Sequence, residues 1–327
     1  MRYFKSSFII AIIGIAIAFW LGGFAGAYIA GLLAVLEISL SFDNAVVNAK
    51  VLQTMDAVWQ KRFVTWGMII AVFGMRFLFP ILIVMVVSGL GFIDTLNIAI
   101  DNPEKYHHIL EANENLIYAF GGAFLLMVFF DFLFEEKEIH WIKLIENNSF
   151  TRTLSKVDNV TIIIATIIGM ILVYETENYK VALAFFSGML IHSLLASLDD
   201  VFDSEAVKSG LLGLIYLEVL DASFSFDGVI GAFALSQDIF LIMIGLGIGA
   251  MFVRSLTLYL VDKGTLTEYR YLEHGAHYAI VVLALIMLAK IFISISEEIT
   301  GTIGIILIGV SFIHSYIENK REEKENA

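Results

Sequence analysis

Carboxylate side chains lie in the middle of two apolar segments that repeat one pattern. The first segment, EISLSFDNAVVNA, runs from Glu37 to Ala49, and the second, DASFSFDGVIGA, begins at Asp221. The two align without a gap, so that Glu37 corresponds to Asp221 and Asp43 corresponds to Asp227. A carboxylate inside an apolar segment is costly in a soluble core and costlier in lipid. We therefore expect the two motifs to carry the function.

Both motifs offer only oxygen atoms as ligands. The candidate ligands are Glu37, Asp43, Asn44, Asp221, Asp227 and Glu218. Such a set suits hard cations such as Mn²⁺, Ca²⁺ and Mg²⁺, and the chain has no cysteine to hold a softer metal. Four or five carboxylates exceed the charge of one divalent cation. Arg76 and Arg254, protons or a second ion must balance the surplus. The cation is expected as a substrate, and no prosthetic group is expected.

The two carboxylates of one motif do not share a helix face. On a continuous helix, Asp43 lies about 120° around the axis from Glu37. Both can turn inward only if the helix unwinds locally or the polar face is broad. Asn and Gly tolerate non-helical backbone, so Asp43–Asn44 and Asp227–Gly228 are the candidate places for such a break.

Other interpretations of the polar residues stay open. The motifs could have a structural role only, in which arginine–carboxylate pairs and Ser hydroxyls hold membrane helices together. Asp199, Asp200 and Asp203 suit either a cytoplasmic entrance for the ion or an acidic first turn of a helix. Asp131 is expected to reach water or to pair with Lys290. The glycines of GLGIGA, residues 245–250, predict close helix packing.

The composition is that of an integral membrane protein. The 327 residues are 59% hydrophobic and 16% charged, with a mean hydropathy of +0.84, whereas soluble domains are about 45–50% apolar and about 25% charged. The long apolar runs do not alternate, which favours helices over barrel strands. The net charge of −13 disfavours nucleic acid and suits cations. The expected partners are the lipid bilayer and the metal ion, and a homo-oligomer stays open.

Apolar runs of about 20 residues predict ten transmembrane helices. They lie near residues 7–21, 24–49, 63–88, 115–134, 159–174, 180–198, 209–235, 239–261, 276–296 and 300–317. The first is short and follows Arg2 and Lys5, so a signal peptide is its alternative. No small-x-small cleavage site precedes Trp20, and Gly22-Gly23 is typical of a tight turn between helices. We therefore interpret the first run as a span.

Positive charge gives the orientation. With ten spans, fourteen Lys and Arg residues fall on the side of the N-terminus, and only Lys105 and Lys180 fall on the opposite side. Cytoplasmic loops carry the excess of positive charge. Both termini are therefore expected in the cytoplasm, with the protein in the cell (inner or plasma) membrane.

The motifs fall in the second and seventh predicted spans and so run in opposite directions. This predicts an all-α polytopic membrane protein with a 5+5 inverted repeat, the recurring plan of secondary transporters. The expected parts are a first five-helix repeat, a cytoplasmic linker, a second five-helix repeat and a charged cytoplasmic tail. They span residues 1–134 plus 159–174, 135–158, 180–317 and 318–327.

The motifs resemble those of the TerC family of membrane proteins, within a broader group of duplicated cation exporters that includes manganese exporters. The resemblance is carried by EISLSFDNAVV and DASFSFDGVIGA, each followed in the next span by an arginine, Arg76 or Arg254. It covers roughly residues 24–296. It implies export of a metal ion, with Mn²⁺ favoured. It also assigns Glu37, Asp43 and Asn44 to the first acidic motif, and Asp221 and Asp227 to the second.

We therefore expect a secondary transporter that exports a divalent cation, with Mn²⁺ favoured. One alternative keeps the architecture and changes the ion to Ca²⁺, or to Na⁺ exchanged for protons. Another is a membrane scaffold that does not transport and delivers metal to exported proteins. An enzyme is not expected, because the chain shows no His-based zinc motif and no nucleophile–base constellation.

Overall fold

The computed structural model describes residues 3–201, 210–233, 235–236, 238–295 and 297–325, and these residues form helices and turns without a strand. Each of the ten predicted apolar segments overlaps a helix. Seven described helices are long and apolar enough to cross a membrane. The all-α character of the described residues is thus confirmed, and the seven helices are consistent with an integral membrane protein. These seven are Lys5–Leu40, Ala57–Leu82, Glu114–Phe134, Tyr179–Ser197, Ile239–Asp262, Leu272–Lys290 and Thr302–Glu322.

The chain divides into two compact units, and each unit takes helices from both predicted repeats. The first comprises Met1–Ala45, Thr54–Glu114 and Ser204–Tyr259, and the second comprises Val46–Gln53, Asn115–Asp203 and Leu260–Ala327. Helices α2 and α14 each continue from the first unit into the second. The helices that lie wholly or partly in the first unit are α1 (Lys5–Leu40), α2 (Phe42–Gln53), α3 (Ala57–Ile69), η1 (Ile70–Leu78), α4 (Phe79–Ser88), α5 (Phe92–Asp101), α6 (Pro103–Glu111), α13 (Leu211–Phe233) and α14 (Ile239–Asp262).

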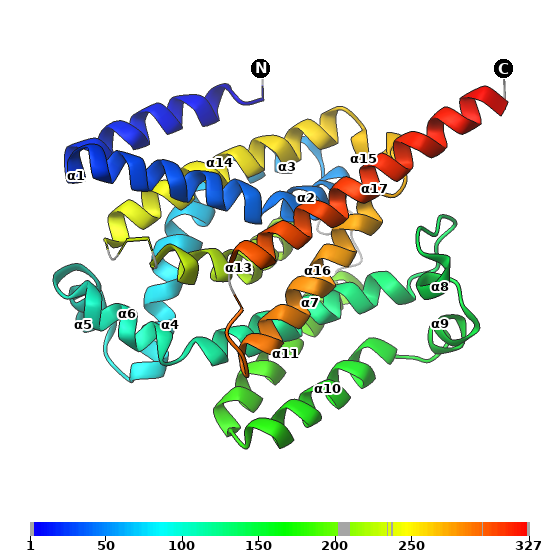
Figure 1. Ribbon diagram of the computed structural model, residues 1–327. Coiled ribbons are helices and arrows are strands. Elements are labelled where there is room, and N and C mark those ends of the chain that lie inside the picture. The colour runs from blue at the N-terminus through cyan, green and yellow to red at the C-terminus, as the bar shows by residue number, and fades with distance from the viewer. Residues whose placement is uncertain (1–2, 202–209, 234, 237, 296, 326–327) are drawn as a thin grey trace. The chain divides into compact units, whose positions relative to one another are not determined.

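Helix α1 reverses direction at Gly22-Gly23 (Figure 1), where Gly23 has a φ of 60°. This left-handed backbone is accessible to glycine at little cost. The two halves then pack closely, since a methyl group built at Gly26 would come within 2.5 Å of the Ala18 carbonyl oxygen. Ala18 and Ala30 are buried together with Leu241 of α14. The turn predicted at this glycine pair is confirmed.

The helix of the first motif breaks at Ser41, and the second motif lies in continuous helix. Ser41 has φ −107° and ψ 19°, between α1 and α2. Its hydroxyl donates to the Glu37 carboxylate at 3.0 Å, and its N–H donates to the Glu37 carbonyl at 3.0 Å. The chain thus changes direction at Ser41 while the backbone hydrogen bond to Glu37 is kept, and the Ser41 hydroxyl adds a second hydrogen bond to the same residue. The predicted breaks at Asp43–Asn44 and Asp227–Gly228 are wrong, because helix runs through both pairs.

A π-helix carries Arg76. Residues Ile70–Leu78 form η1, which ends just before the N-terminus of α4, where Pro80 lies. Proline has no N–H to offer the carbonyl four residues earlier, which here belongs to Arg76, and its ring crowds that carbonyl. Wider π-turns recur at functional sites and change the direction in which a side chain points. The segment therefore orients Arg76 differently from a regular α-helix.

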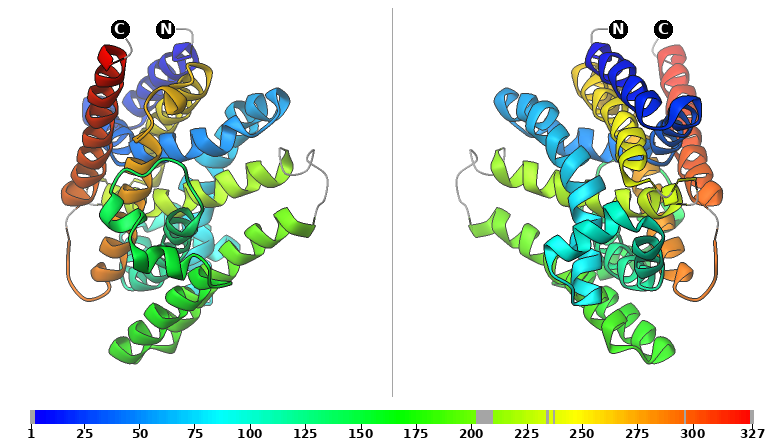
Figure 2. Two further views of the ribbon diagram at one scale, coloured as in Figure 1. Left: turned by 90° about the vertical axis from the view of Figure 1, so that its right-hand side faces the viewer. Right: turned by 90° about the vertical axis from the view of Figure 1, so that its left-hand side faces the viewer.

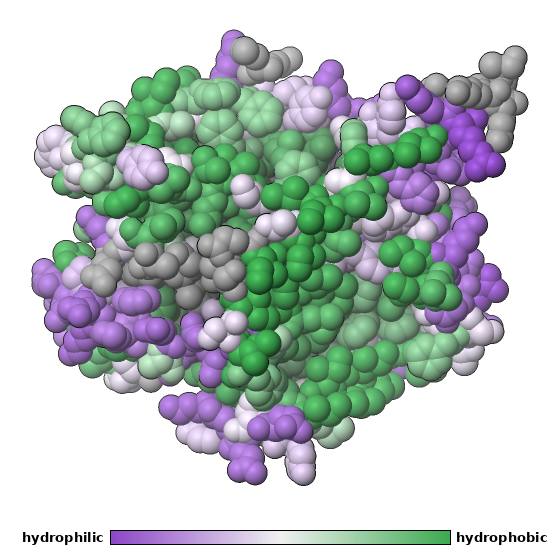
Figure 3. Space-filling view, in the orientation of Figure 1, coloured by the Kyte–Doolittle hydropathy of each residue, from purple (hydrophilic) through white to green (hydrophobic). Residues whose placement is uncertain are grey.

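The second unit contains the remaining helices. They are α7 (Glu114–Phe134), α8 (Lys143–Glu146), α9 (Ser149–Leu154), α10 (Val160–Thr176), α11 (Tyr179–Val201), α15 (Thr265–Glu268), α16 (Leu272–Lys290) and α17 (Glu297–Glu325). Helices α10 and α11 form an antiparallel pair, as the two views of Figure 2 show. Figure 3 shows apolar side chains over α16 and α17. Ile305, Ile306 and Ile313 of α17 are exposed. Such a surface suits contact with lipid.

The predicted linker, residues 135–158, folds onto α16 through one carboxylate. Glu146 accepts a hydrogen bond from the Trp141 N–H at 2.9 Å, and its carboxylate lies 3.1 Å from Nδ1 of His274. Burial alone would raise the pKa of Glu146. The hydrogen bond and charge of His274, with the backbone amides, outweigh burial and hold that pKa below its ordinary 4.5.

Glycines of α14 set the approach of α1, which gives a first prediction. A methyl group at Gly249 would lie 2.5 Å from Cβ of Glu37, whereas one at Gly31 would meet nothing within 4 Å. Gly249→Ala should therefore destabilise the protein by about 1–3 kcal/mol through overpacking. Gly31→Ala is the control and should be neutral or slightly stabilising. Thermal unfolding in detergent measures both, and equal melting temperatures for the two variants would contradict the packing.

The Glu146 carboxylate gives a second prediction. Because its folded-state pKa is depressed, its stabilisation is present above the unfolded value of 4.5 and is lost as pH falls below it. The wild-type melting temperature should therefore drop more between about pH 6 and about pH 3.5 than that of Glu146→Gln. Glu138→Gln, at an exposed position of the same linker, should behave like the wild type. Parallel curves for wild type and Glu146→Gln would refute the assignment.

Candidate cation site

Arg76 contacts acidic residues of both motifs. Its Nη2 donates to the Glu37 carboxylate, and its Nη1 lies 3.7 Å from Oδ2 of Asp221. Nη1 also donates to the Ala71 carbonyl at 2.8 Å, which fixes the guanidinium within its own segment. Only 1% of the Arg76 and Glu37 side chains is exposed. The two motifs, far apart in sequence, therefore meet at one buried cation.

Arg254 extends the same arrangement along α14. Its Nη2 donates to the two carboxylate oxygens of Glu218, at 2.9 and 3.0 Å, and lies 3.8 Å from Oδ2 of Asp221. Its Nη1 donates to the Phe63 carbonyl at 2.8 Å, and the guanidinium carbon lies 4.2 Å from the centre of the Phe63 ring. The five charged residues alternate in the order Glu37, Arg76, Asp221, Arg254, Glu218. We call this the ion-pair chain.

Glycines let the backbone approach this chain. A methyl group at Gly67 of α3 would lie 2.3 Å from Nη1 of Arg254 and 2.6 Å from Oε1 of Glu218. One at Gly228 would lie 3.1 Å from Oε2 of Glu37. Gly228 belongs to the second motif and Glu37 to the first, so the motif helices are in contact at a second point besides Arg76. Side chains at these glycines would separate the charges from their partners.

The ion-pair chain has more negative than positive charge. Three carboxylates, those of Glu37, Asp221 and Glu218, face two guanidinium groups. Oδ2 of Asp221 lies near both guanidinium groups and accepts no hydrogen bond from any described residue. A buried acceptor in this state costs free energy. A cation or a proton at Asp221 would be stabilised by the surplus charge.

Asp43 and Asn44 lie in the first turn of α2 and are also buried, with 5% and 1% exposure. Asp43 accepts a hydrogen bond from the Asn44 N–H at 3.0 Å, and Oδ1 of Asn44 has no hydrogen-bond partner among the described residues. Asp227 lies in α13, but its side chain falls outside the described residues. A close approach of Asp43 to Asp227 therefore stays a prediction.

The described carboxylates do not form a ready-made metal cage. Within the described residues, no group of three or more His, Asp or Glu side chains has the arrangement to hold a metal ion. The physical reason is visible in the ion-pair chain, where guanidinium groups lie between the carboxylates. A cation could gather these oxygens only if the arginines released them.

The side chains proposed for the cytoplasmic entrance fall outside the described part of the structure, and Asp131 pairs outside the ion-pair chain. The side chains of Asp199 and Asp200 and the whole of Asp203 fall outside the described residues. Asp131 lies with its Oδ2 3.3 Å from Nε2 of His192, a contact between α7 and α11 that the sequence did not suggest. The signal that could have found it is a histidine within an otherwise apolar span.

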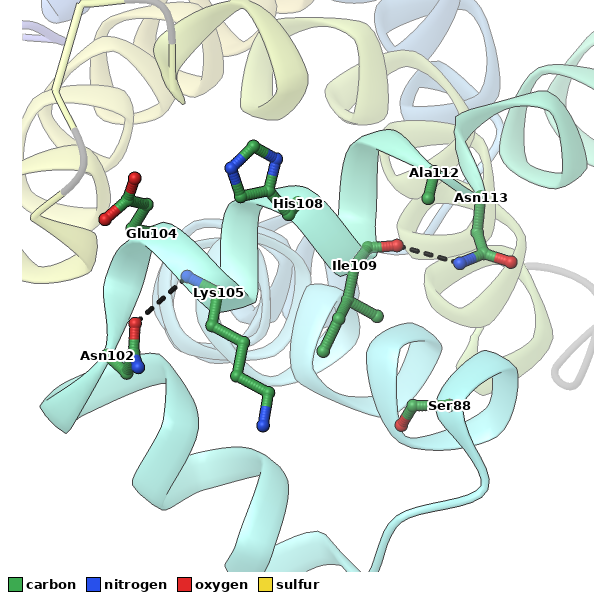
Figure 4. A pocket seen from close by; sticks show the side chains of 8 residues that line it. All are labelled: Ser88, Asn102, Glu104, Lys105, His108, Ile109, Ala112 and Asn113. Carbon is green, nitrogen blue, oxygen red and sulfur yellow. Dashed lines mark hydrogen bonds between the residues drawn. The ribbon is translucent and has the colours of Figure 1, made fainter.

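The segment between the third and fourth predicted spans, which carries Lys105, lines a cavity of about 480 Å³ (Figure 4). Asn102 caps α6 by accepting the Lys105 N–H at 3.1 Å. The cavity carries one carboxylate, Glu104, and one ammonium, Lys105, and these side chains point to opposite sides of the helix in the view. Because the two charges offset each other, this cavity does not attract cations strongly.

Comparison with known proteins supplies a family. A family model described as "Protein of unknown function (DUF475)" matches residues 42–322. The chain belongs to the DUF475 family. No curated protein and no solved structure matches it significantly. In this DUF475 protein the matched region holds every member of the ion-pair chain except Glu37. The family's description names no activity, so the resemblance to TerC proteins stays a prediction.

The ion-pair chain gives a third prediction. Arg76→Met leaves Glu37 and Asp221 buried without this partner, so it should destabilise the protein by about 3–5 kcal/mol. Glu37→Leu combined with Arg76→Met removes both members of the closest pair and should recover part of that loss. Arg62→Met, on α3 away from the chain, is the control. Unfolding of the purified variants in detergent measures these differences. A double variant no better than Arg76→Met would contradict direct pairing.

Proposed function

We propose that this protein is a secondary transporter that exports a divalent cation, with Mn²⁺ the favoured substrate. The observation that supports this most is the position of Arg76 between Glu37 of the first motif and Asp221 of the second. Two copies of one acidic pattern meet there inside a protein with several membrane-spanning helices. Intramembrane carboxylates that meet at a repeat interface are typical of ion sites in secondary transporters.

The proposed topology has ten spans in a 5+5 inverted repeat, with both termini cytoplasmic. Its support is the distribution of Lys and Arg and the way the helices divide between the units. The motif helices and the arginine-bearing helices that follow them, α13 and α14 among them, lie in the first unit. Helices α7, α10, α16 and α17 lie in the second. Four of the five pairs of equivalent predicted spans thus fall in the same unit, and the exception is the first predicted span, whose counterpart α11 lies in the second unit.

In the proposed mechanism the arginines compete with the substrate for the carboxylates. With no cation bound, Arg76 and Arg254 neutralise most of the charge of Glu37, Asp221 and Glu218. An entering cation takes oxygens of Glu37 and Asp221, and the arginines move away from them. Asp43, Asn44 and Asp227 supply further oxygens. Release of the cation restores the ion pairs, so that the unloaded state holds only the surplus charge of one carboxylate.

The oxygen donors do not discriminate firmly among hard cations. Ca²⁺, or Na⁺ exchanged for protons, is the alternative substrate for the same architecture. Uptake of radioactive Mn²⁺ into everted vesicles, measured against competing Ca²⁺, Mg²⁺ and Na⁺, ranks these ions. If unlabelled Mn²⁺ suppresses this uptake and the same concentration of Ca²⁺, Mg²⁺ or Na⁺ does not, the result supports Mn²⁺ as the substrate.

A second candidate is a membrane scaffold that delivers metal to exported proteins without transporting it. It is favoured by the pairing of the described carboxylates with arginines, which suits structural glue between helices. Flux in proteoliposomes of the purified protein distinguishes the two. Transport by the pure protein supports the transporter, whereas partners that co-purify without flux support the scaffold.

The transport proposal gives a fourth prediction. Asp43→Asn and Asp227→Asn should each reduce Mn²⁺ uptake into everted vesicles by tenfold or more, because each removes a charged ligand that Asn replaces only in shape. The amount of inserted protein should not change. Asp94→Asn, on α5 between the third and fourth predicted spans, is the matched control and should keep wild-type uptake. Full uptake by both motif variants would rule out these residues as ligands.

A further inference from the structure

A second cavity, apart from the ion-pair chain, lies in the second unit at the end of α7. Its volume is about 390 Å³, within the range of small-ligand sites. Leu133 and Phe134, the last residues of the span, form part of its wall, and charged and uncharged polar residues of the linker, α9 included, form the rest. The cavity thus joins the end of a membrane-spanning helix to a polar segment.

Lys137 has an unused buried donor in this cavity. Its Nζ is inaccessible to solvent and donates no hydrogen bond to any described residue. It lies 3.2 Å from the centre of the Phe132 ring, a cation–π contact that holds the ammonium in place but offers no lone pair. An ammonium without an acceptor costs free energy. A ligand oxygen in the cavity would supply the missing acceptor.

Two more cations line the cavity. Arg152 donates through Nε to Oδ1 of Asn147 at 2.6 Å, which orients the guanidinium and leaves both Nη groups for a ligand. Lys156 lies four residues further along, just after the end of α9. Together with Lys137 these donors match the oxygens of a phosphate, since a guanidinium offers two parallel N–H groups and an ammonium offers a point charge.

The cavity also carries carboxylates, and these differ in availability. Glu146 is used internally, by the Trp141 amide and by His274. Glu135 and Glu136 are exposed at the rim. Glu135 and Glu136 would repel a ligand whose only charged group is a phosphate. They would attract a ligand that carries an ammonium group as well as a phosphate. The two kinds of charge in one cavity therefore favour a zwitterion.

We propose that this cavity binds a phosphoethanolamine headgroup, with Lys137, Arg152 and Lys156 on the phosphate and with Glu135 and Glu136 on the ammonium. Leu133 and Phe134 end a candidate membrane span, so the expected source is an aminophospholipid of the surrounding bilayer. Basic sites at the ends of membrane-spanning helices recognise lipid headgroups in this way. The site is independent of the proposed transport.

The test is lipid retention by the full-length protein, measured by native mass spectrometry after delipidation and addition of defined lipids. Phosphatidylethanolamine should be retained about tenfold more than phosphatidylcholine or phosphatidylglycerol with the same acyl chains. Phosphatidylcholine has no N–H to donate to the glutamates, and phosphatidylglycerol has no ammonium. Equal retention of the three lipids would overturn the proposal.

Variants separate the two halves of the site. Arg152→Gln combined with Lys156→Gln, at exposed positions whose change does not threaten folding, should lower retention of phosphatidylethanolamine about tenfold. Glu135→Gln combined with Glu136→Gln should instead remove the preference over phosphatidylglycerol while keeping binding. Lys143→Gln, an exposed lysine of α8 outside the cavity, is the control. Wild-type retention by both double variants would refute the site.

Glycerophosphoethanolamine, the same headgroup without acyl chains, distinguishes the sources. Displacement of bound phosphatidylethanolamine at millimolar concentration supports a site that takes the headgroup from solution as well as from lipid. Retention of the lipid despite the competitor supports the bilayer as the source. Displacement by glycerophosphoglycerol to the same extent would overturn the recognition of the ammonium.

Discussion

The cost of removing charge from water is the constraint on which the first unit of this protein depends. Glu37, Asp221 and Glu218 lie among apolar helices, where an isolated carboxylate would be strongly destabilising. Arg76 and Arg254 compensate them in alternating order. Because each arginine faces two acids, the positions of four segments, α1, η1, α13 and α14, depend on one another. A shift of any one of them would leave a buried charge unpaired, and that cost fixes the arrangement more firmly than apolar contact alone, which gives little preference between protein and lipid.

Local backbone features serve this arrangement. Gly245 and Gly249 lie one turn apart on α14, and the missing side chains let α1 approach at Leu33 and Glu37. The π-helix before Pro80 orients Arg76, and the break at Ser41 lets α2 leave the direction of α1 while the backbone bond to Glu37 persists. Each feature would weaken an ordinary helix. Here each places a charged group beside its partner, so the local cost is offset by pairing that the apolar surroundings make strong.

The same pairing bears on function. A site built only of carboxylates would bind a divalent cation tightly and release it slowly, and it would be unstable when empty. Arginine side chains that pair with the carboxylates in the unloaded state speed release of the cation and stabilise the empty site. The surplus negative charge at Asp221 still favours binding of a cation. This arrangement suits a carrier that must alternate between loaded and unloaded states, and it accounts for the lack of a ready-made metal cage among the described residues.

The sequence by itself determined the helices, their membrane character, the turn at Gly22-Gly23 and the pair of acidic motifs, because hydrophobicity and glycine placement act locally along the chain. It also indicated Arg76 and Arg254 as the balancing charges. Only the tertiary structure decided that Arg76 joins Glu37 to Asp221, that Glu218 is engaged by Arg254, and that the helix breaks at Ser41. Hydropathy gives no distance between helices. Which guanidinium reaches which carboxylate depends on glycine contacts and on a π-turn, and these become effective only when segments more than a hundred residues apart are packed together.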